Sequence, residues 1–406
     1  AMGGGAGYDG SAGIGSGSHS TGYTHITLHD GVTVKATGGG NSSLGGGGGA
    51  GIGSGNRAKG NTDILIKGAT KVTAKGGSTA AGIGSGNGSN GSTIINIEGG
   101  TITAEGGGKE NGSCQASGAG IGSGGNALNK TTINIKGGEI TATGGVSLDS
   151  RNHSDKWLSG AGIGSGSNVS GETEINISGD STIKSASGGK YGGAGIGSCS
   201  YSGSTPDSKK GAVTINITGG NIEKATGGGE YVSSSKRWYS GAGIGAGLNA
   251  GTTTINIKDN AHIVSATGGK YGGAGIGSGS SDTKNNSKKG AVTINITDGT
   301  IEKAEGKNGG AGIGSGYYGR SSTVNISGNA ELKDVKGGNL AAGIGSGYDS
   351  DKVDVVIDGG TINATGGDSA AGIGSGLNSR SSVTIKSGTV NAKGNQHSNS
   401  GSSGIG

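Results

Sequence analysis

One short phrase recurs along the whole chain and limits the possible folds more than any other feature. The pattern Ala-Gly-Ile-Gly, in most copies followed by Ser-Gly and called the Gly-Ile-Gly phrase below, occurs eleven times at intervals of 29 to 48 residues. Its isoleucines are Ile14, Ile52, Ile83, Ile121, Ile163, Ile196, Ile244, Ile276, Ile313, Ile344 and Ile373, and a shortened copy contains Ile405. Such self-similarity indicates a repeat architecture, in which each unit packs only against its neighbours.

Two further segments follow the phrase in each repeat. The second segment reads Thr-Ile-Asn-Ile-Lys-Gly-Gly at 132–138, and the third reads Glu-Ile-Thr-Ala-Thr-Gly-Gly at 139–145. Variants of the second occur at 93–100, 214–220, 254–259 and 293–299, and variants of the third at 101–107, 361–367 and 389–394. Apolar, mostly β-branched residues alternate with polar ones, which is the pattern of half-buried strands. A helix is disfavoured, because each Gly would destabilise it by about 1 kcal/mol relative to Ala.

Three short strands per repeat predict an all-β fold, a parallel β-solenoid of about eleven three-sided coils that spans residues 1–406 as a single domain. Equivalent strands of successive coils would lie about 4.8 Å apart, which gives a rod roughly 50 Å long. Each coil would bury few side chains, so the stability would come from cooperation between neighbouring coils.

The composition alone favours disorder, and the repeat argues against it. Gly contributes 103 of 406 residues, and hydrophobic residues reach only 28%. However, the net charge is only +5, Pro occurs once, and the apolar residues are periodic, unlike those of disordered segments. Lys and Arg are scattered despite a pI near 9.0, so we expect no nucleic-acid partner. The sequence has no apolar run of about 18 residues, so we expect no membrane insertion.

One asparagine recurs at the same place in seven consecutive second segments. These residues are Asn96, Asn134, Asn176, Asn216, Asn256, Asn295 and Asn325. Facing outward from stacked strands, their amides would form a ladder like those of cross-β assemblies. We interpret the row as a stabilising ladder rather than as a ligand site.

The Gly-Ile-Gly phrase itself has two interpretations. If Ala, Ile and Ser point inward, the glycines leave a flat strip of exposed backbone along the rod, which is the arrangement we expect because Ile belongs in the core. That strip is either a structural device, in which Gly permits a tight turn or a close approach of another segment, or a docking face. The structural interpretation is favoured.

The two cysteines, Cys114 and Cys199, are expected to be free thiols. Cys199 replaces the last Gly of one phrase. The coil count places the two residues about two coils apart, or roughly 10 Å, which is too far for a disulfide between regular positions.

The three segments together resemble the Gly-rich repeats of large bacterial cell-surface and secreted proteins of the right-handed parallel β-helix, or pectin-lyase-like, kind. The resemblance covers essentially the whole chain. It implies a right-handed solenoid and an extracellular location, at the bacterial surface or secreted. It does not imply one chemistry, because such folds carry adhesion, glycan binding and polysaccharide cleavage. The irregular coil spacing and the mixed outward residues, with no regular Thr array, argue against ice binding.

Long insertions interrupt two repeats just before the phrase, at 146–160 and 229–241. The offsets from Trp157 to Trp238 and from Tyr191 to Tyr271 are 81 and 80 residues, which indicates a duplicated two-coil unit. Equivalent corners line up in a solenoid, so these aromatic residues should share one edge. The candidate ligand-binding residues are Trp157, Trp238, Tyr239, Tyr231, Tyr191, Tyr271, Lys190, Lys270 and Arg237. Such a row either packs over the coil or holds sugar rings or a protein, and packing is favoured.

Catalytic and metal-binding signals are weak. The six histidines form no metal-spaced cluster, and no nucleophile motif lies in a strand-turn-helix context. We therefore expect no catalytic residue and no cofactor. Asp349, Asp351 and Asp354, together with Asp358, form the densest acidic group and are weak candidates for Ca²⁺, although a solvated loop is the favoured interpretation.

Three functions remain open at this point. The leading hypothesis is a non-catalytic bacterial surface protein that acts as a stalk and adhesive surface, with a host or environmental glycan or a surface protein as its partner. The alternatives are a carbohydrate-binding module that uses the aromatic edge and a polysaccharide lyase or hydrolase. Ala1-Met2 is typical of a cloning scar, and neither end resembles a cap, so we expect a fragment of a longer array that self-associates end to end or face to face.

Overall fold

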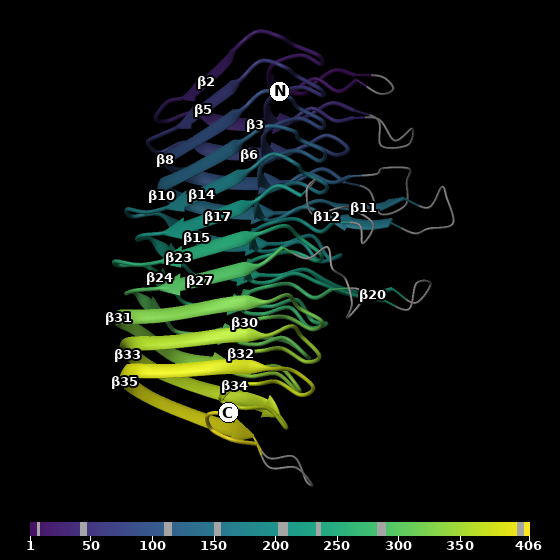
Figure 1. Cartoon of the computed structure of the whole chain (residues 1–406). Helices are drawn as coiled ribbons and strands as arrows, with labels where there is room; N and C mark the ends of the chain where they lie inside the picture. Colours follow the sequence, from purple (N-terminus) through teal and green to yellow (C-terminus); the bar gives the residue numbers. More distant parts are fainter. Residues whose placement is uncertain are drawn as a thin grey trace.

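The computed structural model describes residues 1–5, 9–40, 47–108, 116–149, 156–201, 210–232, 237–281, 290–395 and 402–406. Its strands are stacked in layers from the N-terminal to the C-terminal end of a single column (Figure 1). Most neighbouring strands come from successive repeats and run parallel. The expected β-solenoid is therefore confirmed. Within the described part of the chain, no helix has the length and hydrophobicity to cross a membrane.

The Gly-Ile-Gly phrases form one parallel sheet of eleven two-residue strands. In chain order these are β1 (Ile14–Gly15), β4 (Ile52–Gly53), β7 (Ile83–Gly84), β9 (Ile121–Gly122), β13 (Ile163–Gly164), β16 (Ile196–Gly197), β22 (Ile244–Gly245), β26 (Ile276–Gly277), β30 (Ile313–Gly314), β32 (Ile344–Gly345) and β34 (Ile373–Gly374). Each Ile is in register with the Ile of the next coil, as Ile14 is with Ile52.

The second and third segments form the other large sheet. The separate second strands are β2 (Thr24–Leu28), β5 (Thr62–Ile66), β14 (Thr173–Ile177), β17 (Val213–Ile217), β23 (Thr253–Ile257) and β27 (Val292–Ile296). The separate third strands are β3 (Thr33–Thr37), β6 (Lys71–Lys75), β15 (Thr182–Ser187), and the broken pairs β18 (Asn221–Ile222) with β19 (Ala225–Thr226), β24 (His262–Ile263) with β25 (Ala266–Thr267), and β28 (Thr300–Ile301) with β29 (Ala304–Glu305). Both segments merge into one long strand in β8 (Thr93–Glu105), β10 (Thr131–Thr143), β31 (Ser322–Lys336), β33 (Val353–Asp368) and β35 (Ser381–Asn395).

The core is a continuous column of small and β-branched side chains. In one coil Ile133, Ile135, Ile140 and Ala142 are fully buried, whereas the alternate residue Asn134 is half-buried on the outer face. The alternation expected from the sequence is confirmed, because successive side chains of a strand point to opposite faces.

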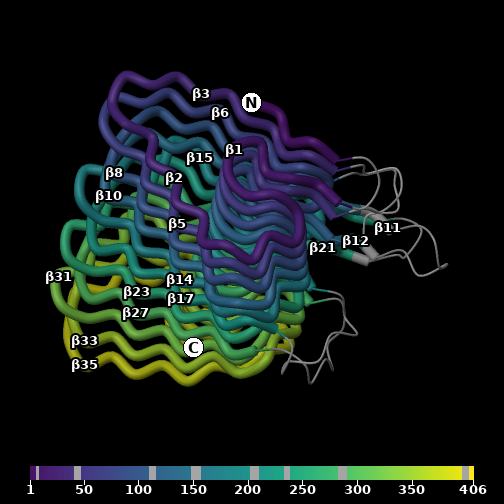
Figure 2. The backbone as a smooth tube through the Cα atoms, turned by 90° about the horizontal axis from the view of Figure 1, so that it is seen from above, coloured from purple at the N-terminus to yellow at the C-terminus, as the bar shows by residue number. Residues whose placement is uncertain are grey.

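The expected strip of exposed glycine is wrong. Figure 2 shows β2 and β3 on the outside of the first coil and β1 nearer its centre, and in later coils the phrase glycines as well as Ile are buried. A Cβ added at Gly51 would lie 2.8 Å from the backbone nitrogen of Lys75, at the end of the third strand. At Gly53, which has a φ of +137°, an added Cβ would overlap the carbonyl oxygen of Gly84 in the next coil. The phrase therefore uses Gly for close backbone packing inside the coil, and it offers no docking face.

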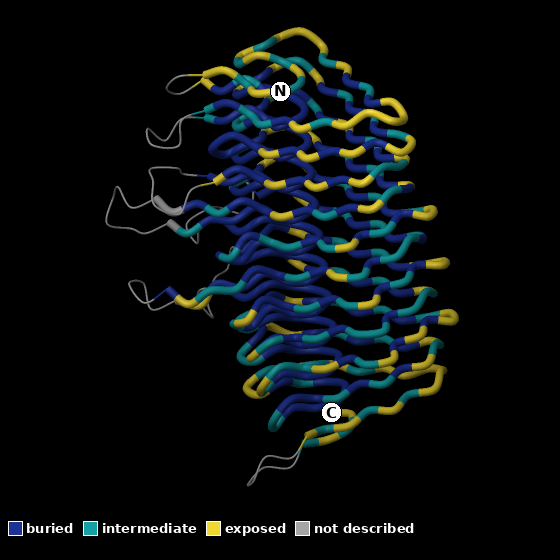
Figure 3. The backbone as a smooth tube through the Cα atoms, turned by 180° about the vertical axis from the view of Figure 1, so that it is seen from behind, coloured by how far each residue is buried: buried dark blue, intermediate teal, exposed yellow. Residues whose placement is uncertain are grey.

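Buried serines complete the hydrogen bonding of the phrase. Ser54 Oγ accepts the Gly86 N–H of the next coil at 3.0 Å, and Ser85 Oγ accepts the Gly124 N–H at 2.9 Å. Both hydroxyls are buried, where an unpaired backbone N–H would be costly. The Ser of most phrases thus accepts the backbone N–H that follows the phrase strand of the next coil, whereas the phrase of β22 has Ala246 at this position. Figure 3 shows buried backbone through the interior of the stack and exposed positions gathered at turns.

The asparagine ladder is confirmed. Each Nδ2 donates to the Oδ1 of the Asn in the preceding coil, from Asn134 onto Asn96 at 2.9 Å to Asn325 onto Asn295 at 2.9 Å. The bonds between these ends are 2.8 to 2.9 Å long. The row stops after Asn325 because Val356 lies opposite it in the next coil.

Cys199 is free and fully buried, as expected for an incidental thiol. Burial raises the pKa of this thiol above its usual value. Cys114 lies outside the described residues.

Candidate functional site

Among the residues that the structure describes, two antiparallel hairpins project from one corner of the parallel solenoid, between the third strand and the next phrase (Figure 1). One pairs β11 (Val146–Asp149) with β12 (Lys156–Ser159), and the other pairs β20 (Gly229–Val232) with β21 (Arg237–Ser240). Both insertions recognised in the sequence thus occur at the same corner, and each holds one of the two tryptophans.

The first hairpin packs onto the coil that follows it. The indole ring of Trp157 meets the phenol ring of Tyr191 edge to face, with centroids 4.4 Å apart and an interplanar angle of 62°. The backbone N–H of Tyr191 donates to Ser159 Oγ at 2.9 Å, which fixes the ring beneath the hairpin. The Lys190 ammonium lies 4.9 Å from the centre of the same ring, within the range of a cation–π interaction.

The second hairpin covers this pair with its inner face. Val232 and Tyr239 are each 6% exposed and cluster with Tyr191 and Leu248. The rings of Tyr239 and Tyr191 are 6.3 Å apart. Trp157 is half-buried against the same cluster. Trp157, Tyr191 and Tyr239 therefore pack against one another over the coil.

The outer face of the second hairpin is open to solvent. Tyr231 and Trp238 lie opposite each other in the hairpin and are 39% and 41% exposed. Their rings are 4.6 Å apart, and Trp238 is 4.8 Å from Tyr271 of the next coil. Lys270 lies 5.2 Å from the centre of the Tyr271 ring. The side chain of Arg237 lies outside the described part of the structure.

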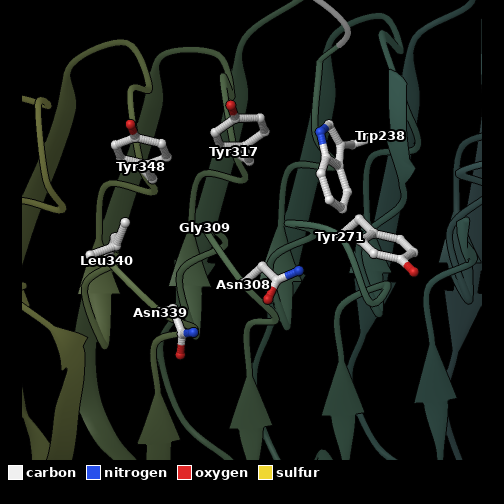
Figure 4. A pocket seen from close by; sticks show the side chains of 8 residues that line it. All are labelled: Trp238, Tyr271, Asn308, Gly309, Tyr317, Asn339, Leu340 and Tyr348. Carbon is white, nitrogen blue, oxygen red and sulfur yellow. The ribbon is translucent and has the colours of Figure 1, made fainter. Parts of the chain in front are cut away.

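The exposed aromatic residues continue into a groove of about 270 Å³ that runs along the stack. It is lined by Trp238, Tyr271, Asn308, Gly309, Tyr317, Asn339, Leu340 and Tyr348 (Figure 4). Tyr317 and Tyr348 come from successive coils, and their rings stack with centroids 5.3 Å apart and an interplanar angle of 20°. The aromatic surface is therefore longer than the hairpin that begins it.

Sequence reasoning missed Tyr317, Tyr348 and Leu340. The signal for the two tyrosines was present, because each directly follows a phrase, at the fourth position after Ile313 and Ile344. The same position is Leu248 after Ile244. Aligning this position across coils would have revealed four apolar or aromatic residues in the last five coils, Leu248, Tyr317, Tyr348 and Leu377, with Ser280 between the first two.

The groove carries no formal charge on the eight residues that line it. A tyrosine is neutral at physiological pH in any case, and burial, with the adjacent Tyr318 hydroxyl as a second cause, raises the pKa of Tyr317 further above its usual value. The exposed amides of Asn308 and Asn339 stand beside the rings and supply hydrogen-bond donors and acceptors. The site is suited to a neutral ligand that is in part aromatic or apolar.

The acidic group weighed as a Ca²⁺ site does not gather around a common point. Asp354 pairs with Lys352 at 2.7 Å, and Asp349 occupies a left-handed turn position with a φ of 51°. In the ranges that the structure describes, no three His, Cys, Asp or Glu side chains come together in a way that could hold a metal ion. The arrangement of Asp349, Asp351 and Asp354 fits a charged surface turn.

Comparison with known proteins found a family model that fits the repeats. A family model described as beta helix repeat matches residues 64–87, 95–125, 133–167, 175–201, 215–248, 294–317, 355–377 and 383–406, which is more than half of the chain. No curated protein and no solved structure matches the chain significantly.

Proposed function

Because this chain belongs to the beta helix repeat family, whose members share a fold rather than one chemistry, we propose that it is a non-catalytic scaffold of the bacterial cell surface or secreted space. In this proposal the solenoid is a stiff stalk, and the groove at the hairpin corner is its adhesive surface. The partner is a glycan or a protein of the surface to which the stalk adheres.

The hydrogen bonds along the stack support the role of a stalk. Backbone groups of each phrase bond to the next coil, as Ile52 N–H does to Gly82 O at 3.0 Å. The asparagine ladder adds a side-chain row parallel to the same direction. Bending the column would strain both rows at once, so these paired networks favour a rigid spacer.

The exposed aromatic groove is the main structural support for the adhesive role. Tyr231 and Trp238 leave two-fifths of their side chains exposed, next to the cavity lined by Tyr317, Tyr348 and Leu340. Large exposed aromatic residues around a concave site are characteristic of binding surfaces, where they supply most of the affinity. A stalk without a ligand would gain nothing from this exposure.

A binding screen on immobilised glycans and extracellular proteins tests the proposal. The chain is compared with the double variant Trp238→Ala, Tyr317→Ala, and with Tyr23→Ala as the matched control. Tyr23 is 66% exposed and lies several coils away, so its variant also removes an exposed ring. We expect at least a tenfold loss of binding for the double variant and none for the control, because a central aromatic residue of an interface contributes about 2 kcal/mol or more.

Equal binding by the native chain and the double variant, with circular dichroism showing both folded, would refute the adhesive role of the groove. The enzyme alternative is tested on the same samples by incubation with acidic and neutral polysaccharides. Release of reducing or unsaturated ends above that of a buffer control would refute the non-catalytic assignment.

A further inference from the structure

The duplicated two-coil unit allows the groove to be compared with an equivalent site in the same molecule. Leu248 and Tyr317 follow the phrase at the same position in the two units. The backbone N–H of Leu248 donates to Gly192 O at 2.8 Å, and that of Tyr317 donates to Gly272 O at 2.8 Å. Trp157 lies on Tyr191 in the first unit as Trp238 lies on Tyr271 in the second. The two sites thus share one framework.

The units differ in what covers that framework. In the first, the hairpin of β20 and β21 brings Val232 and Tyr239 over Tyr191, which is only 4% exposed. In the second, a tight turn replaces the hairpin. Asn308 adopts a φ of 45°, and Gly310 N–H donates to Lys307 O at 3.0 Å. The groove therefore occupies, in the second unit, the position that the hairpin of β20 and β21 covers in the first.

We propose that the groove is a receptor site for a β-hairpin or tight loop of another protein, which presents an aromatic side chain beside a β-branched one. This inference rests on the proposed adhesive role of the groove and names the class of its partner. In the covered site, the ring of Tyr239 packs beside Tyr191 and Leu248. The aromatic ring of the partner would occupy the equivalent position in the groove, beside Tyr271 and Tyr317.

The ring geometry favours an aromatic side chain over a sugar. Tyr318 stacks on Tyr317 with centroids 4.1 Å apart and an interplanar angle of 30°, so one face of Tyr317 is already covered, and the ring of Tyr348 lies nearly parallel to Tyr317 at 5.3 Å. An aromatic ring packs edge to face against such partly covered rings, as Trp157 and Tyr191 do at 62°. A sugar ring would instead need a broad, exposed ring face on which to lie.

The backbone around the groove favours a hairpin over a single added strand. Three backbone N–H groups beside the groove already donate to carbonyl oxygens of the preceding coils. The pairs are Tyr317 with Gly272, Tyr348 with Gly309, and Leu377 with Leu340. Their donors are therefore used along the stack, and a lone extended strand would leave its own backbone groups unpaired. A hairpin satisfies its backbone internally and needs only side-chain contacts, with the Asn308 and Asn339 amides available at the rim.

The hairpin of this chain is the probe for the first experiment. A cyclised peptide with the sequence of residues 229–240, carrying Phe at the place of Trp238, is titrated into the full chain by calorimetry. Its matched control carries Ala at the places of Val232 and Tyr239. We expect binding of the first peptide that weakens at least tenfold with the control peptide and with the protein variant Tyr317→Ser, whereas Tyr317→Phe retains it.

Cellohexaose and chitohexaose are titrated in parallel to represent glycans. Saccharide binding that Tyr317→Ser abolishes, without peptide binding, would overturn the polypeptide assignment and leave the adhesive role standing. Failure of peptide and saccharides alike also overturns the assignment, whereas the adhesive role is judged separately by the Trp238→Ala, Tyr317→Ala screen.

A graft provides a second measurement that does not depend on the stability of a free peptide. In the graft, the sequence of residues 229–240 replaces Asn308-Gly309, and the tryptophan of the inserted copy is changed to Phe. The background also carries Trp157→Phe, so the native Trp238 is the single tryptophan that reports on the groove. If the groove is complementary to the hairpin, acrylamide quenching of Trp238 falls at least twofold, and the graft carrying Ala for both inner residues restores it. Unchanged quenching in the first graft would contradict the proposal.

Discussion

The indole of Trp157 meets the phenol of Tyr191 edge to face at 4.4 Å, and the hairpin of the following unit closes over the pair. Eighty residues later the same pairing recurs between Trp238 and Tyr271 at 4.8 Å, but no hairpin follows. One ring pair belongs to a buried cluster, and the other forms the end of an open groove. The same ring pair is thus part of a covered structural cluster in one unit and borders an open groove in the other.

The two tryptophans should separate stability from binding. Trp157→Ala removes the ring that packs on Tyr191 and should lower the free energy of unfolding by about 2 kcal/mol, less than a fully buried Trp because Trp157 is half-buried. Trp238→Ala should cost less than about 1 kcal/mol but reduce adhesion. Urea unfolding followed by circular dichroism measures the first effect. Equal destabilisation by the two variants would contradict the assignment of Trp157 to packing.

The asparagine ladder should contribute to stability in proportion to the bonds that each residue makes. Asn216 donates to Asn176 and accepts from Asn256, both at 2.8 Å. Asn216→Ala removes both bonds and should cost about 1–2 kcal/mol. Thr214→Ala, on the same outer face of the same strand, is the control and should cost less. Denaturant titrations that rank the two variants in the opposite order would show that the ladder does not stabilise the stack.

Glycine inside the phrase should be irreplaceable. Gly245 has a φ of +131°, and an added Cβ would overlap the carbonyl oxygen of Gly277. Gly245→Ala should therefore cost more than about 3 kcal/mol, from strain and overpacking together. Gly22→Ala places its methyl group where nothing lies within 4 Å and should be close to neutral. Thermal unfolding of both variants measures the contrast, and similar melting temperatures would argue against the close packing of the phrase.

The thiol of Cys199 should be unreactive in the folded chain. It is fully buried, and burial raises its pKa, so little thiolate forms at neutral pH. In a Cys114→Ser background, Ellman's reagent at pH 8 should label Cys199 only after the addition of denaturant. Rapid labelling of the native protein would contradict its position in the core.

The repeat pattern predicted the strands and the ladder because both depend on local alternation and on register between equivalent positions. Asn134 stacks on Asn96 for a reason that is visible in the sequence. The location of Gly53 was not predictable in the same way, because both sides of the phrase contact backbone from other segments, and alternation alone does not reveal a strand that is buried on two faces.

The groove shows a second limit of sequence reasoning. The tryptophans and their duplication indicate the correct corner, but the sequence alone does not distinguish the role of Trp157 from that of Trp238. The two sites differ in burial because a hairpin follows the first, whereas a short turn at Asn308 follows the second. This turn is two coils from Trp238 in the sequence, but both residues line the same groove. Tyr317 and Tyr348 join the site through stacking between coils.

The decisive measurement for the proposed function is the adhesion of a chain whose groove has been closed. The native chain and the graft of residues 229–240 in place of Asn308-Gly309 are compared in adhesion to whatever glycan or protein the screen identifies. The graft leaves Trp238, Tyr271, Tyr317 and Tyr348 in place and fills the space between them. If the groove is the adhesive site, the graft loses at least nine-tenths of the binding, roughly 1.4 kcal/mol, whereas adhesion equal to that of the native chain would contradict this role of the groove.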